Sequence, residues 1–294
     1  MLSVGTGLIF TLMITRTVTR EQYGVWVNLN SDIIAYFTLL ATALPFWVMR
    51  FVSRRHEGSA KTGVIANMIL GLVSVGVYVS MVPWILSALK IGGSYIPLYV
   101  LASVQIIWVY LTAAFEAILR VVRIEALGYG LLVEEAVKVA VAYLLIFHFK
   151  LGLLGAMTAL ITGYSLQVIY YLYVSRGKLR GKVKLSYVKE WVKGSLATVY
   201  TIIGNRIFSF SLVLLFAIGR EVARAYYGAS TQIAGVIGHS SFLAFALYPR
   251  LLVRRSSGDV SIAFKSFLMF AVPMTVGAIV LSDSYLTILD VKYR

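Results

Sequence analysis

Nine apolar stretches, separated by short charged or glycine-rich segments, run through this chain of 294 residues. They lie at about 2–17, 25–49, 63–89, 95–119, 128–148, 151–174, 194–219, 225–249 and 262–282. A helix of about 20 apolar residues crosses the roughly 30 Å hydrocarbon core of a bilayer, and every stretch but the first is that long. Hydrophobic residues make up 60% of the chain and charged residues 13%, against about 45–50% and about 25% in soluble domains. We therefore expect an all-α polytopic membrane protein with about nine transmembrane helices, because barrel strands would alternate polar and apolar residues.

The basic residues set the expected orientation. The chain has 27 Lys and Arg residues against 12 Asp and Glu residues, a formal net charge of +15. A cytoplasmic N-terminus places the larger share of these cations in cytoplasmic loops, above all in 176–193, as the positive-inside rule requires. We predict a multi-pass protein of the cell membrane whose basic loops meet anionic lipid and not nucleic acid. No cysteine and only three scattered histidines are present, so we expect no disulfide, metal site or cofactor.

An internal repeat links the two halves of the chain. A shift of 204 positions aligns residues 14–50 with 218–254, and about a quarter of the aligned pairs are identical. The identical pairs include Ile14/Ile218, Arg16/Arg220, Arg20/Arg224, Tyr23/Tyr227, Gly24/Gly228, Ile33/Ile237, Leu39/Leu243, Pro45/Pro249 and Arg50/Arg254. Composition explains matched Leu and Ile, but three arginines, a Tyr-Gly pair and a proline in register indicate a repeat. Six spans separate the copies, so both halves enter the membrane from the same side, an arrangement known in transporters.

Two segments within this repeat resemble a known family. Thr15-Arg-Thr-Val-Thr-Arg-Glu-Gln-Tyr-Gly-Val-Trp26 resembles the turn after the first helix of polysaccharide flippases of the O-antigen and teichoic-acid type. Arg220-Glu-Val-Ala-Arg-Ala-Tyr-Tyr-Gly-Ala-Ser230 resembles the matching turn of their second half. These flippases belong to the multidrug/oligosaccharidyl-lipid/polysaccharide exporter superfamily. The resemblance implies a MATE-like fold of two six-helix bundles around a central cavity, which moves lipid-diphosphate-linked glycans by alternating access.

The repeat and the basic loop define the expected domains. Residues 1–175 are predicted to form the first six-helix bundle, 176–193 a basic cytoplasmic loop, and 194–294 a partial second bundle holding spans seven to nine. The first span is short and the second bundle lacks spans. We therefore expect the chain to be an incomplete member of its family, with about ten residues missing at the start and further helices missing at the end.

Two cations lie at the centre of predicted spans. Arg206 is the midpoint of 194–219, and Lys138 is central in 128–148. A charged side chain at that depth costs at least ~2.5–3.5 kcal/mol, so each should face a cavity or a partner and not lipid. These cations would attract a diphosphate or an acidic sugar crossing the membrane. For Lys138 the alternative is a structural pair with Glu134, one helical turn away.

Carboxyl groups and polar stripes complete the set of candidate residues. Protonation of Glu134 or Glu135 would couple transport to a proton gradient, because burial favours a neutral carboxyl group. Asn28, Ser31, Asp32 and Ala35 follow a helical stripe in 25–49, a span in which Pro45 predicts a kink. Thr198, Asn205 and Ser209 form a second stripe, and Gln232 is the repeat partner of Asn28. The stripes predict either the wall of a hydrated, sugar-compatible cavity or hydrogen bonds between helices.

Four arginines lie at the predicted outer ends of helices. They are Arg16, Arg20, Arg220 and Arg224. Such residues anchor a helix to lipid headgroups, and we expect that role here before substrate contact.

Three functional hypotheses remain open. The first is a flippase for a lipid-linked oligosaccharide, with a polysaccharide polymerase or glycosyltransferases as candidate partners. The second is an exporter of organic cations with the same fold, which would favour acidic and aromatic residues at the midplane. The third is a non-transport membrane component of glycan synthesis. An enzyme is not expected, because no Walker-type loop is present and Glu134 and Glu135 point about 100° apart as neighbours on a helix.

Overall fold

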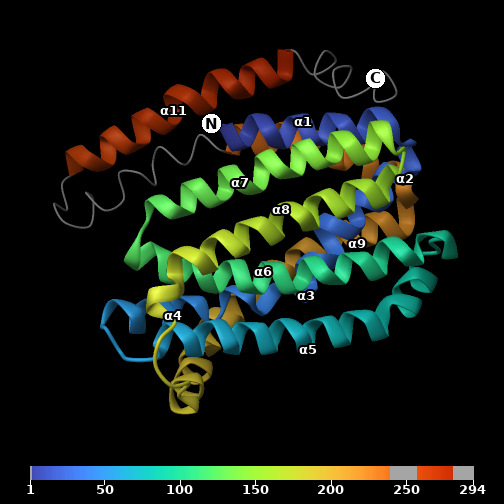
Figure 1. Cartoon of the computed structure of the whole chain (residues 1–294). Coiled ribbons are helices and arrows are strands. Elements are labelled where there is room, and N and C mark those ends of the chain that lie inside the picture. Colours follow the sequence, from blue (N-terminus) through green and yellow to red (C-terminus); the bar gives the residue numbers. More distant parts are fainter. Residues whose placement is uncertain (1, 239–256, 281–294) are drawn as a thin grey trace. The chain divides into compact units, whose positions relative to one another are not determined.

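A computed structural model describes residues 2–238 and 257–280, and in these ranges all regular secondary structure is helical (Figure 1). The longer helices are α1 (Leu2–Thr17), α2 (Arg20–Val27), α4 (Pro45–Ser53), α5 (Ser59–Ala88), α6 (Ile96–Val122), α7 (Glu125–Ala142), α8 (Gly152–Ser175), α9 (Leu185–Gly238) and α11 (Ser257–Val280). The chain divides into two compact units, 1–224 and 225–294. The predicted bundle boundaries at 175 and 193 stay predictions, and the predicted second bundle includes 239–256 and 281–294, which lie outside the described residues.

Three helical segments of the described chain are long and apolar enough to cross a membrane. They are Ser59–Ala88, Gly93–Val122 and Gly152–Lys178, and they contain the predicted spans 63–89, 95–119 and 151–174 almost completely. A bent pair, Arg20–Phe37 with Leu39–Ser53, would make a fourth span. Helix α7 carries four charged residues along its length, which lowers its apolar character. The count of nine spans stays a prediction.

The helices α5, α6, α8 and α7 lie side by side in the first unit (Figure 1). Their core includes buried aromatic side chains at both ends of the bundle. Tyr78 donates a hydrogen bond to the backbone carbonyl of Tyr99 at 2.8 Å, and Tyr171 donates to that of Leu127 at 3.1 Å. A buried hydroxyl group that is satisfied in this way avoids a penalty of about 1–3 kcal/mol. These bonds tie α5 to α6 and α8 to α7 inside an otherwise apolar interior.

The predicted span 25–49 is a broken helix. Asn28–Ile33 is a π-helical segment, in which the backbone N–H of Ile34 reaches the carbonyl of Leu29, five residues earlier. The short helix α3 (Ile34–Phe37) ends at Thr38, and the axis bends by 56° before α4. Pro45 is the first residue of α4, where its missing N–H costs nothing. The predicted kink is therefore present, but the chain bends at Thr38, before the proline.

The predicted break between 219 and 225 is absent. Helix α9 runs without interruption over 54 residues from Leu185 to Gly238, through Arg220 and Arg224. The segment holds no proline, and Gly219, the last residue of the predicted span 194–219, is tolerated within a helix at a modest cost. Charged residues alone do not end a helix. The predicted break of the helix between the spans 194–219 and 225–249 was therefore wrong.

Gly24, of the repeated Tyr-Gly pair, lets the backbones of α2 and α9 approach each other closely. This buried glycine of α2 faces the backbone of α9, and an added Cβ would lie 1.9 Å from the carbonyl oxygen of Glu221. We expect Gly24→Ala to destabilise the protein by at least about 1–3 kcal/mol, because two backbones would have to separate. Gly76→Ala is the matched control: Gly76 lies in α5 with no atom near its Cβ position. Thermal unfolding in detergent should show a loss for Gly24→Ala only, and equal midpoints would contradict this close approach.

Candidate functional site

Three charged side chains of α7 form a buried cluster. The Nζ atom of Lys138 lies 3.3 Å from Oε1 of Glu134 and 2.8 Å from Oε1 of Glu135. All three side chains are about nine-tenths buried, with exposed fractions of 10%, 7% and 11% for Lys138, Glu134 and Glu135. The predicted pairing of Glu134 with Lys138 is confirmed. The bond to Glu135 was missed, although positions three and four before a lysine share one helical face.

Neighbouring helices enclose this cluster. The ammonium group of Lys138 lies 5.5 Å from the ring centre of Phe10 on α1, within the range of a cation–π contact. Gly163 of α8 packs on the other side, where an added Cβ would come within 2.8 Å of the carbonyl oxygen of Glu134. The missing side chain lets α8 approach α7 closely. The cluster is therefore held between three helices of the first unit.

The cluster has one carboxylate more than it has cations. Two ionised glutamates and one lysine leave a net charge of −1 in a low-dielectric surrounding. Oε2 of Glu135 is fully buried and accepts no hydrogen bond from the described residues. The cluster therefore keeps one negative charge that Lys138 does not balance. Lys138 is already compensated, so it does not act as a free cation for a diphosphate in this arrangement.

A second buried ion pair connects α9 with the π-helical segment. The guanidinium of Arg224 donates from Nε to Oδ2 of Asp32 at 2.6 Å and from Nη2 to Oδ1 at 2.7 Å. Both side chains are 3% exposed. The expectation that Arg224 anchors to lipid headgroups was wrong, because its charged end is turned into the protein toward Asp32. Asp32, a candidate for the cavity wall, instead forms a contact between helices.

The polar stripe of the second span does not form one face. Asn28 and Asp32 are buried, Ser31 is exposed and Ala35 is half-buried. The π-helical hydrogen bonding changes the angular spacing of residues, so a pattern counted at 3.6 residues per turn fails here. Neither polar atom of the Asn28 side chain finds a partner among the described residues. Such unsatisfied buried groups call for a functional explanation, and Asn28 remains a candidate site residue.

Three predicted site residues have side chains outside the described part. Asn205, Arg206 and Gln232 belong to the backbone of α9, and their candidate roles stay predictions. Among the described residues, no cluster of His, Asp and Glu is arranged to hold a metal ion.

An apolar cavity of about 350 Å³ lies near the bend of the second span. Tyr36 and Phe37 line it from α3, Trp84 from α5, and Phe210 from α9. Its wall is almost wholly aromatic and aliphatic, and Ile33 connects it to the π-helical segment. A cavity of this composition accepts a hydrocarbon chain or a flat apolar molecule.

Known structures resemble this chain in fold. No family model and no curated protein matches it. An inward-facing multidrug resistance MATE family transporter of the MOP superfamily matches with a TM-score of 0.68 and 13% identity, covering 98% of this chain and 72% of its own. A TM-score of 0.62 and 15% identity relate the chain to a MOP superfamily transporter from Pyrococcus furiosus, which is described with a binding pocket of reverse polarity. The match covers 99% of this chain and 71% of that transporter. An outward-facing structure of a multidrug resistance MATE family transporter of the MOP superfamily matches with a TM-score of 0.59 and 15% identity, and the match covers 98% of this chain and 71% of the transporter. The chain therefore has the fold of the MATE transporters.

Proposed function

We propose that this chain is a membrane transporter that flips a lipid-linked oligosaccharide or polysaccharide repeat unit from the cytoplasmic to the outer leaflet by alternating access. The observation that carries transport is the likeness to MATE transporters over 98% of the chain. We further propose nine spans, a cytoplasmic N-terminus and a place in the cell membrane, since this orientation keeps most cations in cytoplasmic loops. A polysaccharide polymerase or glycosyltransferases would supply or consume the substrate.

The glycan substrate is supported by the sequence and by the apolar cavity. Both segments that resemble polysaccharide flippases have structural roles, since Gly24 and Arg224 each form contacts between α9 and the second span. The cavity beside Tyr36 and Trp84 fits a lipid chain. A lipid-linked substrate needs both an apolar contact and a polar path. The first unit offers an apolar contact at this cavity and, at Asn28, a buried amide without a partner among the described residues.

Proton uptake by Glu134 and Glu135 is the proposed coupling step. The net negative cluster accepts a proton when the two carboxylates share one lysine, and release would follow when the cluster meets water in another conformation. The same cluster favours the second candidate function, export of an organic cation, because a net −1 charge in an apolar interior attracts a cationic substrate. The aromatic lining of the cavity fits such a molecule as well.

Deletion of the gene in its native host separates the two functions. We expect complete, undelivered lipid-linked units to accumulate, as measured by mass spectrometry, because synthesis continues while export stops. Re-expressed wild-type protein and the Arg54→Ala variant, which removes an exposed cation, should restore export. The Arg206→Ala variant should not restore it, because it removes the predicted midplane cation. Unchanged lipid-linked glycans with new sensitivity to cationic drugs would overturn the flippase in favour of the second candidate.

A further inference from the structure

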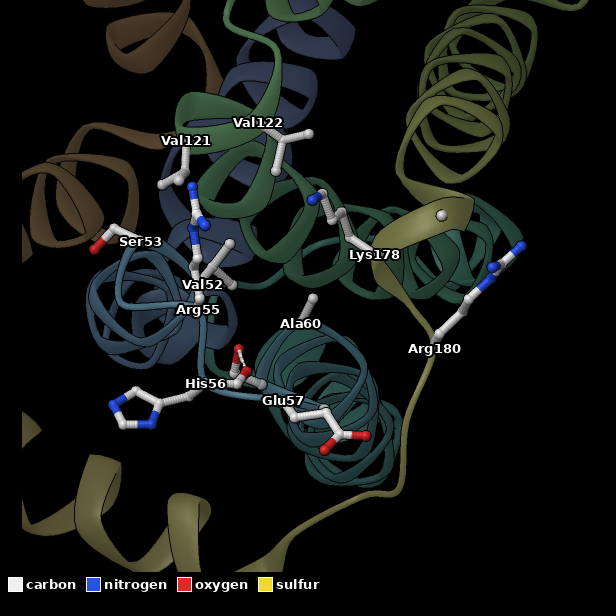
Figure 2. Close-up of a pocket in the computed structure, with 13 residues that line it drawn as sticks. Val52, Ser53, Arg55, His56, Glu57, Ala60, Val121, Val122, Lys178 and Arg180 are labelled. Carbon is white, nitrogen blue, oxygen red and sulfur yellow. Dashed lines mark hydrogen bonds between the residues drawn. The ribbon is translucent and has the colours of Figure 1, made fainter.

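A polar cavity of about 740 Å³ opens where three connecting segments meet (Figure 2). Its lining comes from the turn between α4 and α5, from the end of α6, and from the segment that follows α8. With the predicted cytoplasmic N-terminus, the loops after the second, fourth and sixth predicted spans are cytoplasmic. These are the three segments that the structure brings to one end of the helix bundle. None of the charged residues of the candidate site described above takes part in it.

The cations of this cavity have no carboxylate partners among the described residues. Arg55, Lys178 and Arg180 line it together with a single acid, Glu57, and none of the three forms an ion pair there. Two arginines at the same end of the bundle are paired: Arg120 with Glu116, and Arg123 with Glu125. Figure 2 shows Arg55 extending toward Val121 and Lys178 toward Val122, while Arg180 points away from both. The cavity therefore holds an excess of positive charge, contributed by two different connecting segments.

The floor of the cavity adds donors without adding a counter-charge. Ala60 lies in the first turn of α5, a helix of 30 residues whose N-terminus has no side-chain cap. The helix dipole and the remaining first-turn amides at such an end favour an anion; the N–H of Ser59 already donates to the carbonyl of His56 at 3.2 Å. Val52 and Val121 supply apolar walls beside the cations. A phosphate or diphosphate group attached to a hydrocarbon tail fits this combination better than a free inorganic ion, which gains nothing from the valines.

Backbone contacts hold the cavity in place. Gly58, at φ 74°, precedes α5, and an added Cβ would lie 2.2 Å from the carbonyl oxygen of Lys182. The hydroxyl of Thr62 accepts a hydrogen bond from the backbone N–H of Lys184 at 3.0 Å. The segment that carries Lys178 is thus fastened to the start of α5, across more than a hundred residues of sequence. Fixed positions lower the entropy lost when a ligand binds.

We infer that this cavity binds the phosphate or diphosphate group of a membrane amphiphile. Two sources carry that group: the diphosphate of a lipid-linked glycan carrier and the headgroup of an anionic phospholipid. The inference rests on the proposed function only for the first source. A carrier held here would be positioned at the cytoplasmic surface before transport, whereas a phospholipid would fasten the loops to the membrane.

The test uses the full chain in nanodiscs of phosphatidylcholine, with inorganic diphosphate as the soluble probe. We expect the double variant Arg55→Gln/Lys178→Gln to bind diphosphate roughly tenfold or more weakly, since each charge-assisted contact contributes to affinity. The matched control is Arg54→Gln/Lys189→Gln, which removes two exposed cations that do not line the cavity, one in the turn after α4 and one near the start of α9. Arg55 and Lys178 are exposed, so both proteins should unfold at the wild-type temperature, and the single variants repeat the test with one charge removed.

Competition identifies the source of the group. Displacement of diphosphate by a polyprenyl diphosphate in the nanodisc supports the carrier lipid, and displacement by phosphatidylglycerol supports the anionic phospholipid. Equal diphosphate affinity for the cavity variant and its control overturns the site. If diphosphate is displaced but the protein is shown not to export glycans, the binding site is supported and only the proposed function is overturned.

Discussion

Replacing Lys138 by methionine is expected to lower the free energy of unfolding by about 3–5 kcal/mol, because it leaves two buried carboxylates without their cation. Methionine keeps much of the length and apolar volume of the lysine chain, so the loss reports on charge and not on a void. Glu134 and Glu135 would repel each other and would have no other charged partner on α7. Unfolding of the purified protein in detergent, followed by circular dichroism, measures the change.

Glu135→Gln is the matched comparison. This variant leaves one glutamate and one lysine, a neutral pair at 3.3 Å, and it replaces the carboxylate of Glu135 by an uncharged amide of the same shape. We expect a stability close to the wild-type value together with a loss of proton-coupled transport in proteoliposomes. A Lys138→Met protein as stable as Glu135→Gln would contradict the structural role of the cluster. Full transport by Glu135→Gln would exclude this carboxyl group from coupling.

The helices with continuous apolar runs could be predicted from sequence. The predicted spans 63–89, 95–119 and 151–174 correspond to α5, α6 and α8, because unbroken apolar residues leave the backbone no other way to satisfy its hydrogen bonds in a membrane. The bend at Thr38 was harder to place. It lies where α3 gives way to a 3-10 helix at Leu39–Thr42, and no local residue pattern marks that change.

Some contacts of the candidate site could likewise be predicted from the sequence, and others could not. The contact between Glu134 and Lys138 was predictable, because residues four apart on a helix always meet. The pair of Asp32 and Arg224 was not, because 192 residues separate its members and nothing local links them. The repeat did mark Arg224 as the partner of Arg20, but it indicated an equivalent position and not a contact. That Arg55 and Lys178 line one cavity likewise depends on how the loops pack, which a single sequence does not reveal.

Asp32→Ala is expected to destabilise the protein by about 3–5 kcal/mol, because the guanidinium of Arg224 would stay buried without its carboxylate. Arg224→Ala should cost a similar amount, for the reverse reason. The double variant Asp32→Ala/Arg224→Ala should lose much less than the sum of the two, since it removes both charges together. Unfolding midpoints of the three proteins give the coupling between the side chains.

A change that keeps the charge of Arg224 but alters its bonding geometry tests the ion pair with Asp32 more sharply than removal of the charge. Arg224→Lys keeps the positive charge, but an ammonium group cannot make the two parallel bonds that Nε and Nη2 make to Asp32. We expect this variant to lose more than half of the stability lost by Arg224→Ala, and an exposed control, Arg54→Lys, to lose none. Because the pair joins α9 to the bent second span, a bidentate bond would fix the angle between them as well as their distance. Full stability of Arg224→Lys would mean that any cation suffices, and that α9 and the second span are positioned by the packing at Gly24 instead.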